Sequence, residues 1–339
     1  MGMIALPAAT AWAAPGRFPQ GWNDDSDLTG IHWEATETPP LQLTPDAIRE
    51  VSSTGPLVIR LLRTDHGTET PVAGLLEQAQ IGCPAGATRF KLNLLLNNRW
   101  IVITQGANTP YSVVADLPCQ GTQELVFQQE SVAGQALGIW QVAERARHKL
   151  EGAIGLGFWN RKIEFSWPDD GDYYSWGVVH LTRGDHWDVV GHEMGHAIYD
   201  LGGIGAMGGG QHKIDECYTE ALALSEGWAS FFSAWVNLKL DDADARFEYL
   251  VPRRAPIRIE NVPEDVCKGQ KNEWRVSGFF WDLIDTHDDG EVQAESFARM
   301  WRSLEGTRVP TAGAARDRMI SGGVSADFLK VIWALNRME

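Results

Sequence analysis

The sequence predicts an α+β fold, with an N-terminal β-sandwich followed by a second domain that has a small sheet and a mainly helical C-terminal half. Two observations carry this prediction. Between residues 30 and 130, aliphatic and β-branched runs are separated by Gly, Pro, Asn and Asp at spacings of about 8 to 15 residues, which is typical of a sandwich. Beyond Asp185, apolar residues recur at the helical period instead. Strands followed by a series of helices indicate α+β rather than alternating α/β architecture.

The individual elements follow from the same patterns. The predicted strands of the sandwich begin at Pro56, Pro71, Thr88, Arg99, Tyr111 and Glu124. A helix over residues 140–150 and strands over residues 162–168 and 175–181 come next. The predicted helices of the C-terminal half cover residues 186–200, 215–238, 273–285, 294–304 and 325–336, with Ser325 as the N-cap of the last. The glycine-rich residues 201–210 predict a loop, because glycine is costly in a helix. We therefore place the sandwich at residues 15–130 and the second domain at residues 131–339.

Charge excludes two classes of partner. The 339 residues contain 29 Lys and Arg against 45 Asp and Glu, a formal net charge of −16. Such a field repels phosphate backbones and anionic lipid headgroups, so we expect no nucleic-acid partner and no docking on an acidic membrane. No apolar run reaches the length of about 18 residues that a transmembrane helix requires, so we expect no transmembrane segment.

The first residues indicate secretion. Residues 1–14 resemble a clipped signal peptide, because a short apolar run ends in Ala11-Trp12-Ala13, which fits the A-x-A cleavage pattern. The first basic residue is Arg17, so the charged start of such a peptide is missing, and an apolar tail is the alternative. We expect a secreted or extracellular protein, the periplasm and the cell surface included.

The cysteines favour the same location. Their even number, 4, and the lack of a C-x-x-C pair suit two disulfides in an oxidising compartment. We favour Cys83–Cys119 and Cys217–Cys267, because each pair then stays within one predicted domain. Buried free thiols in a cytosolic protein are the alternative.

A metal-binding motif lies in the first predicted helix of the C-terminal half. His192, Glu193 and His196 form an H-E-x-x-H sequence. Residues four apart lie on the same face of a helix, so both histidines can present a ring nitrogen to one metal ion. Glu193 lies beside them without being needed as a ligand, and its natural task is to take a proton from a metal-bound water. The flanking residues are uncharged, as expected for a helix buried beneath an active site.

Glu226 is the candidate third ligand. It stands in the middle of an apolar helical segment, between Leu224 and Trp228. A carboxylate in such a place is costly to bury unless it is paired or binds a metal, and a side chain pointing to solvent from the helix edge is the alternative. His192, His196 and Glu226 would make the His₂Glu set of catalytic zinc sites, with one Zn²⁺ per chain.

These residues resemble a known family. HEMGH followed by SEGWASFF is similar to the gluzincins, the thermolysin-like zinc metallopeptidases, in secreted forms whose third ligand lies in an E-G-W-A segment. The resemblance covers roughly residues 160–290. It implies a zincin-like catalytic domain, His192, His196 and Glu226 as zinc ligands, and hydrolysis of peptide bonds by a zinc-bound water that Glu193 activates. The metzincin pattern fits worse, because Tyr199 and Gly202 stand where it needs Gly and a ligand.

One position departs from the family pattern. Four residues after the third ligand, thermolysin-like enzymes often have an Asp that orients a zinc-bound histidine, and this chain has Ser230. Asp188, Asp200 and Asp215 are the candidate substitutes that could orient a zinc-bound histidine, besides Ser230 itself.

Two further features of a peptidase site are predicted. The tetrahedral oxyanion needs a donor besides zinc, and the candidates are Tyr218, His212, Tyr199 and Arg275. The strand beginning Ser175-Trp176-Gly177 resembles the edge strand along which such peptidases pair an extended substrate, with an ordinary core strand as the alternative.

Other interpretations remain open. The acidic turn from Asp285 to Glu291 suggests Ca²⁺, but His287 and Ser296 stand where an EF-hand needs Asp or Asn and Glu, so a solvated turn is favoured. The alternatives to a peptidase are a secreted adhesion or carbohydrate-binding protein with a structural zinc site, and a zinc hydrolase that acts on something other than peptides.

Overall fold

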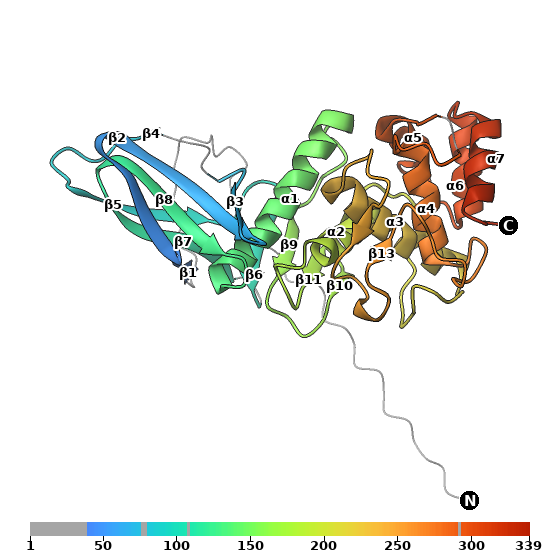
Figure 1. Ribbon diagram of the computed structural model, residues 1–339, viewed down its shortest axis with the longest axis horizontal. Coiled ribbons are helices and arrows are strands. Elements are labelled where there is room, and N and C mark those ends of the chain that lie inside the picture. Colours follow the sequence, from blue (N-terminus) through green and yellow to red (C-terminus); the bar gives the residue numbers. More distant parts are fainter. Residues whose placement is uncertain (1–38, 76–79, 107–108, 291–292) are drawn as a thin grey trace, which may run out of the picture. The chain divides into compact units, whose positions relative to one another are not determined.

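The computed structural model describes residues 39–75, 80–106, 109–290 and 293–339. Residues 40–339 form one compact unit. The structure is mixed α+β, as predicted, with strands toward the N-terminal side of the sequence and helices toward the C-terminal side (Figure 1). The predicted signal peptide, residues 1–14, lies outside the described residues. None of the described helices is long and apolar enough to cross a membrane.

A four-stranded sheet is built around the long strand β2. Its strands are β2 (Ala47–Asp65), β3 (Thr68–Pro71), β4 (Gln80–Ile81) and β8 (Gln120–Gln128), in the order β3-β2-β4 with β8 paired to β2. The second part of β2 runs parallel to β8, from Val58 opposite Thr122 to Thr64 opposite Gln128. In this part alternate residues, including Leu57, Ile59 and Leu61, are buried and turn one face of the sheet toward the core.

A seven-stranded sheet joins the two halves of the sequence. Its strands are β1 (Leu41–Leu43), β5 (Arg89–Leu95), β6 (Ile101–Gln105), β7 (Thr109–Pro118), β9 (Ile163–Ser166), β10 (Tyr173–Ser175) and β11 (Val178–His180). The order is β1-β7-β6-β9-β11-β10, with β5 paired to β7. β6 and β9 are parallel, with Ile103 opposite Phe165, so the sheet crosses the predicted boundary at residue 130. The division into two domains stays a prediction.

The helices match most of the sequence-based expectations. They are α1 (Val132–Ile154), α2 (Trp187–Leu201), α3 (Glu220–Asn237), α4 (Glu273–Ile284), α5 (Phe297–Leu304), α6 (Ala312–Ser321) and α7 (Ala326–Leu335), with a 3₁₀ turn η1 (Pro252–Arg254) and a small hairpin of β12 (Arg246–Phe247) and β13 (Ile257–Arg258). Ser325 caps α7 as predicted, accepting from the Phe328 amide at 3.3 Å.

Four expectations about elements were wrong. The predicted strand beginning at Pro71 is not formed, because β3 ends at Pro71 and a turn over residues 73–75 follows. α1 begins at Val132, well before the predicted residue 140, because Ser131 caps it by accepting from the Gly134 amide. α6 was not predicted, because its short sequence has only a weak apolar face of Ala312, Ala315 and Met319. Residues 175–181 are not one strand, because Trp176 and Gly177 have positive φ values of 51° and 96° and turn the chain between β10 and β11.

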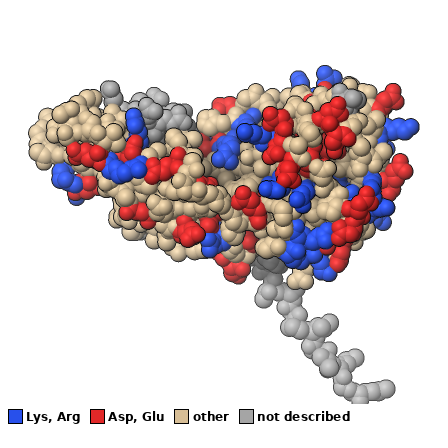
Figure 2. All heavy atoms as spheres, viewed as in Figure 1, with Lys and Arg blue, Asp and Glu red and all other residues tan. Residues whose placement is uncertain are grey.

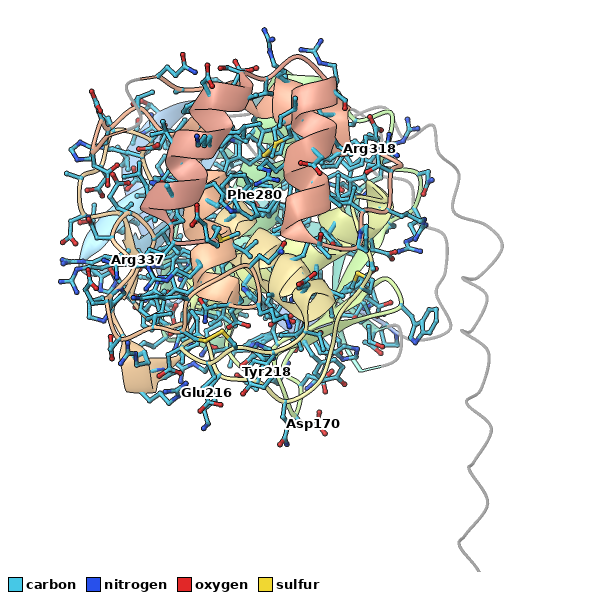
Figure 3. All side chains as sticks on the ribbon, turned by 90° about the vertical axis from the view of Figure 1, so that its right-hand side faces the viewer. Asp170, Glu216, Tyr218, Phe280, Arg318 and Arg337 are labelled. Carbon is cyan, nitrogen blue, oxygen red and sulfur yellow. A yellow bond between two sulfur atoms is a disulfide. The ribbon has the colours of Figure 1, made fainter. Side chains whose placement is uncertain are left out.

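The interior of the helical part is aromatic. Trp228, Trp274, Trp281 and Trp301 are among its largest fully buried side chains, and Phe280 lies within the group of helices in Figure 3. Lys and Arg are interspersed with Asp and Glu on the face shown in Figure 2. The structure contains both disulfides that the sequence favoured, Cys83–Cys119 and Cys217–Cys267.

Candidate metal centre

α2 and α3 lie side by side and bring the three predicted ligands together (Figure 1). The Nε2 atoms of His192 and His196 each lie 3.2 Å from the same atom, Oε2 of Glu226. All three side chains are buried. Ligands about 2.0 to 2.1 Å from a tetrahedral ion are separated by about 3.3 Å, so the spacing of these atoms fits Zn²⁺.

Two glycines allow the helices to approach this closely. A Cβ added to Gly195 would lie 2.8 Å from Cα of Ala229 on α3. A Cβ added to Gly191 would lie 2.4 Å from Oγ of Ser233, also on α3. The glycines within and beside the H-E-x-x-H motif therefore set the distance across which the histidines and Glu226 meet.

Two serines contact the far nitrogens of the histidines. Oγ of Ser230 lies 3.1 Å from Nδ1 of His192, and Oγ of Ser225 lies 3.4 Å from Nδ1 of His196. A hydroxyl that accepts the Nδ1 proton leaves the Nε2 lone pair for a metal. Ser230 thus contacts the candidate ligand His192 through the ring nitrogen that faces away from Glu226. Ser225 was not predicted, because a serine beside a ligand on a buried helix carries no signal of its own in the sequence.

The three aspartates considered as substitutes are engaged elsewhere. The Asp188 carboxylate accepts from the backbone amides of Glu248, Tyr249 and Leu250. Asp200 accepts from Arg161 and Tyr174, and Asp215 accepts from Arg253. Asp188 therefore anchors the loop around residue 249 to the start of α2.

The charges at the centre depend on one another. Burial opposes ionisation of Glu226, but the imidazoles of His196 and His192 outweigh it and hold the pKa of that carboxyl well below its usual range. Burial raises the pKa of Glu193, although the same two imidazoles oppose the shift. Glu226 is therefore ionised and ready to bind a cation, whereas Glu193 is closer to the pKa that suits proton transfer at neutral pH.

The four candidate oxyanion donors have different surroundings. His212, in the loop between α2 and α3, lies closest to the centre, with Nε2 3.6 Å from Oε2 of Glu226. The Tyr218 hydroxyl donates to Glu216, and the Tyr199 hydroxyl donates to the Ala206 carbonyl. Nη2 of Arg275 donates to the carbonyls of Pro263 and Val266. Of the four, the structure brings His212 to Glu226.

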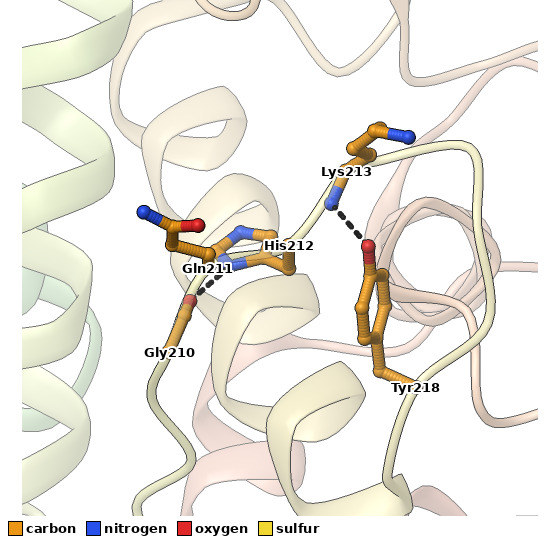
Figure 4. A pocket seen from close by; sticks show the side chains of 5 residues that line it. All are labelled: Gly210, Gln211, His212, Lys213 and Tyr218. Carbon is orange, nitrogen blue, oxygen red and sulfur yellow. Dashed lines mark hydrogen bonds between the residues drawn. The ribbon is translucent and has the colours of Figure 1, made fainter.

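His212 also lines a cavity of about 540 Å³, together with Gly210, Gln211, Lys213 and Tyr218 (Figure 4). Its Nε2 lies 3.2 Å from Oε2 of Glu273, the first residue of α4. Burial, and then the neighbouring Glu226 carboxylate, raise the pKa of Glu273 well above its usual value. Sequence analysis did not single out Glu273, because its distance from the motif along the chain hides its proximity in space.

Of the three residues predicted to form a substrate strand, only Ser175 lies in a strand. Ser175 ends β10, which is the edge strand of the seven-stranded sheet, but Trp176 and Gly177 form the turn that follows it. Trp176 is 86% exposed at this turn. β10 contacts α2, the helix that carries Glu193.

The residue that would complete an EF-hand after the acidic turn has a different role in the structure. Ser296, at the position where an EF-hand needs Glu, caps α5 by accepting from the Arg299 amide. Among the described residues, two groups of three His or carboxylate side chains are close enough to hold a metal ion, and neither includes this turn.

Comparison with known families gives one match. Residues 158–310 match the model of a family described as the mycolysin C-terminal domain, a span that includes α2, α3 and α4. This match supports the resemblance to thermolysin-like metallopeptidases at a coarse level. No curated protein matches the chain. The two disulfides fit an extracellular protein.

Proposed function

We propose that this protein is a secreted zinc metallopeptidase of the gluzincin type. The observation that carries the proposal is the convergence of two imidazole nitrogens on one buried carboxylate oxygen, each at 3.2 Å. Two histidines and one glutamate are a donor set of catalytic zinc sites and leave a further coordination position open. A zinc ion held there would supply Lewis acidity, which polarises a carbonyl and makes water a stronger acid.

Glu193 is the general base in this proposal. It shares α2 with both histidines and is buried beside them. Its raised pKa suits a group that first takes the proton of the attacking water and then gives it to the leaving amine. Neither step requires Glu193 to bind the metal.

His212 with both ring nitrogens protonated is the proposed second donor to the oxyanion, because Nδ1 donates to the Gly210 carbonyl and Nε2 needs a proton of its own to donate. Its Nε2 lies 3.6 Å from Oε2 of Glu226, whereas the other three candidates hydrogen-bond to other groups. The side chain is partly exposed at the cavity of Figure 4, so substrate can reach it. An extended peptide would pair with the open side of β10, the edge strand of the sheet, which contacts the Glu193 helix α2.

Three substitutions test this function. Glu193→Gln keeps the shape of the side chain and all three ligands, so about one tightly bound zinc per chain should remain while turnover of peptides falls at least about 100-fold. His196→Ala and Glu226→Ala should lose both zinc and activity. His148→Ala, which removes an exposed histidine on α1, is the control and should change neither.

The measurements are zinc analysis and cleavage of a peptide library followed by mass spectrometry. A fully active Glu193→Gln protein would overturn the mechanism. A binding protein with a structural zinc would hold zinc and cleave no peptide in any variant. A hydrolase for other substrates would leave the library intact and lose a non-peptide activity, such as ester hydrolysis, in Glu193→Gln.

A further inference from the structure

A second group of potential ligands lies beside the first and shares one residue with it. It consists of His212 from the loop before α3, Glu226 on α3 and Glu273 at the start of α4. Nε2 of His212 lies 3.6 Å from Oε2 of Glu226 and 3.2 Å from Oε2 of Glu273. No two of the ligand atoms are more than 4.8 Å apart. These residues come from three separate segments, so the tertiary fold alone brings them together.

The Nδ1 nitrogen of His212 is engaged by the backbone, which leaves Nε2 for another partner. Its Nδ1 lies 2.9 Å from the carbonyl oxygen of Gly210, as Figure 4 shows. A carbonyl only accepts hydrogen bonds, so Nδ1 carries the proton, and in the neutral ring Nε2 presents a lone pair. Nε2 lies 3.6 Å from an oxygen of Glu226 and 3.2 Å from an oxygen of Glu273. Three acceptor atoms so close together are favourable only with a cation or a proton among them.

Glu273 lacks a partner that would neutralise it. It is 6% exposed, and its Oε2 is buried and accepts no hydrogen bond among the described residues, although Nε2 of His212 is near. The positive charge of Arg253 lowers the pKa of Glu273, but Arg253 is paired with Asp215 through both terminal nitrogens. A buried carboxylate in this situation is costly unless it binds a cation.

The surrounding structure holds the group in place while leaving an entrance. Nδ2 of Asn272, the N-cap of α4, donates to the carbonyls of Ile214 and Glu216 at 2.8 and 2.9 Å, which ties the His212 loop to Glu273. The Cys217–Cys267 disulfide adds a second link to this loop. The imidazole borders the cavity of about 540 Å³, so an ion can enter from there.

We propose that His212, Glu226 and Glu273 form a second zinc site, which shares Glu226 with the first. Zn²⁺ suits it because one imidazole and two carboxylates are ligands that this ion accepts. The effect on activity rests on the proposed function: Nε2 of His212 can donate to the oxyanion only when it carries a second ring proton, and an ion bound to this nitrogen takes the place of that proton. Occupation of the second site therefore slows peptide hydrolysis, and free zinc regulates the enzyme through it.

Equilibrium dialysis of the full chain against rising concentrations of free zinc tests the site. The wild type should bind two ions per chain, the second more weakly than the first. Glu273→Gln and His212→Ala should each keep the first ion and weaken the second at least about 10-fold, since even partners outside the coordination shell contribute 10 to 100-fold to metal affinity. Glu220→Gln is the matched control, because Glu220 is likewise the first residue of its helix, α3, and this variant should bind two ions.

A wild type that binds only one ion at every zinc concentration would overturn the proposal and show that a proton is shared by His212 and Glu273. Two ions in both Glu273→Gln and His212→Ala would overturn it as well. Zinc inhibition of hydrolysis that needs at least about 10-fold more free zinc in Glu273→Gln than in the wild type would support the regulatory effect. Two bound ions without any peptide hydrolysis would leave the second site standing and refute the proposed function.

Discussion

The α2–α3 pair and the β6–β9–β11–β10 part of the sheet both border the candidate centre, but they are built by different contacts. The helices meet through small residues, since a Cβ on Gly195 or Gly191 would collide with α3. The strands meet through backbone pairing between distant segments, such as Ile103 with Phe165. The candidate ligands therefore depend on the lack of side-chain bulk where α2 meets α3, whereas the sheet depends on large buried side chains and on strand register.

The largest change in the free energy of unfolding is expected from a substitution in the sheet. Phe165 is fully buried in β9, between β6 and β11. Phe165→Ala should lower the free energy of unfolding by about 3 to 5 kcal/mol, because it removes apolar contacts and leaves a cavity. Urea unfolding measures the change, and Ile48→Ala, at a side chain 46% exposed on β2, is the control with little expected effect. Equal effects of the two substitutions would contradict the importance of this core.

A smaller effect is expected from the helix seam. Gly195→Ala should lower the free energy of unfolding by about 1 to 3 kcal/mol, because the new methyl group would lie 2.8 Å from Cα of Ala229. The first zinc should also bind more weakly, since α2 must move away from Glu226. The matched control is Gly152→Ala in α1, where an added Cβ meets nothing within 4 Å and helix propensity should stabilise the protein by up to about 1 kcal/mol. Urea unfolding and zinc dialysis check both variants, and a stabilised Gly195→Ala protein would show that the seam has room.

The smallest change in the free energy of unfolding is expected at Asp169, which follows β9, and it depends on pH. Partial burial opposes ionisation of Asp169, but hydrogen bonds from His180, the Asp170 amide and Ser166 outweigh it and lower the pKa to about 2. An unfolded Asp titrates near pH 3.9, so the stabilisation is complete above that value and is lost as the pH falls toward 2.

Asp169→Asn should therefore cost no more than about 1 kcal/mol at neutral pH, because partial exposure screens the charge. The difference from the wild type should shrink between about pH 4 and 2. Urea unfolding at several pH values measures it, with Asp170→Asn, at the exposed neighbour, as the control. A difference that stays constant down to pH 2 would show that the Asp169 charge contributes nothing.

Local patterns were sufficient for the helices and for part of the centre. The 3.6-residue period predicted α2, α3, α4, α5 and α7, and Ser325 was recognised as a cap because an N-cap bond is made within four residues. The prediction of one strand over residues 175–181 was wrong, because Trp176 adopts a positive φ, which is not expected for a tryptophan. α6 was not predicted, because its Ala and Gly residues give little difference in hydrophobicity between its two faces.

The sequence by itself determined that His192 and His196 face one point, because a helix places residues four apart on the same side whatever surrounds it. It also singled out Glu226, because a lone carboxylate in an apolar helix needs a partner. Only the tertiary structure decided that Ser225 and Ser230 contact the histidines, that His212 and Glu273 meet at Glu226, and that β9 pairs with β6. These contacts join segments far apart in the chain, and their geometry follows from how helices and strands pack rather than from the spacing of residues within any one of them.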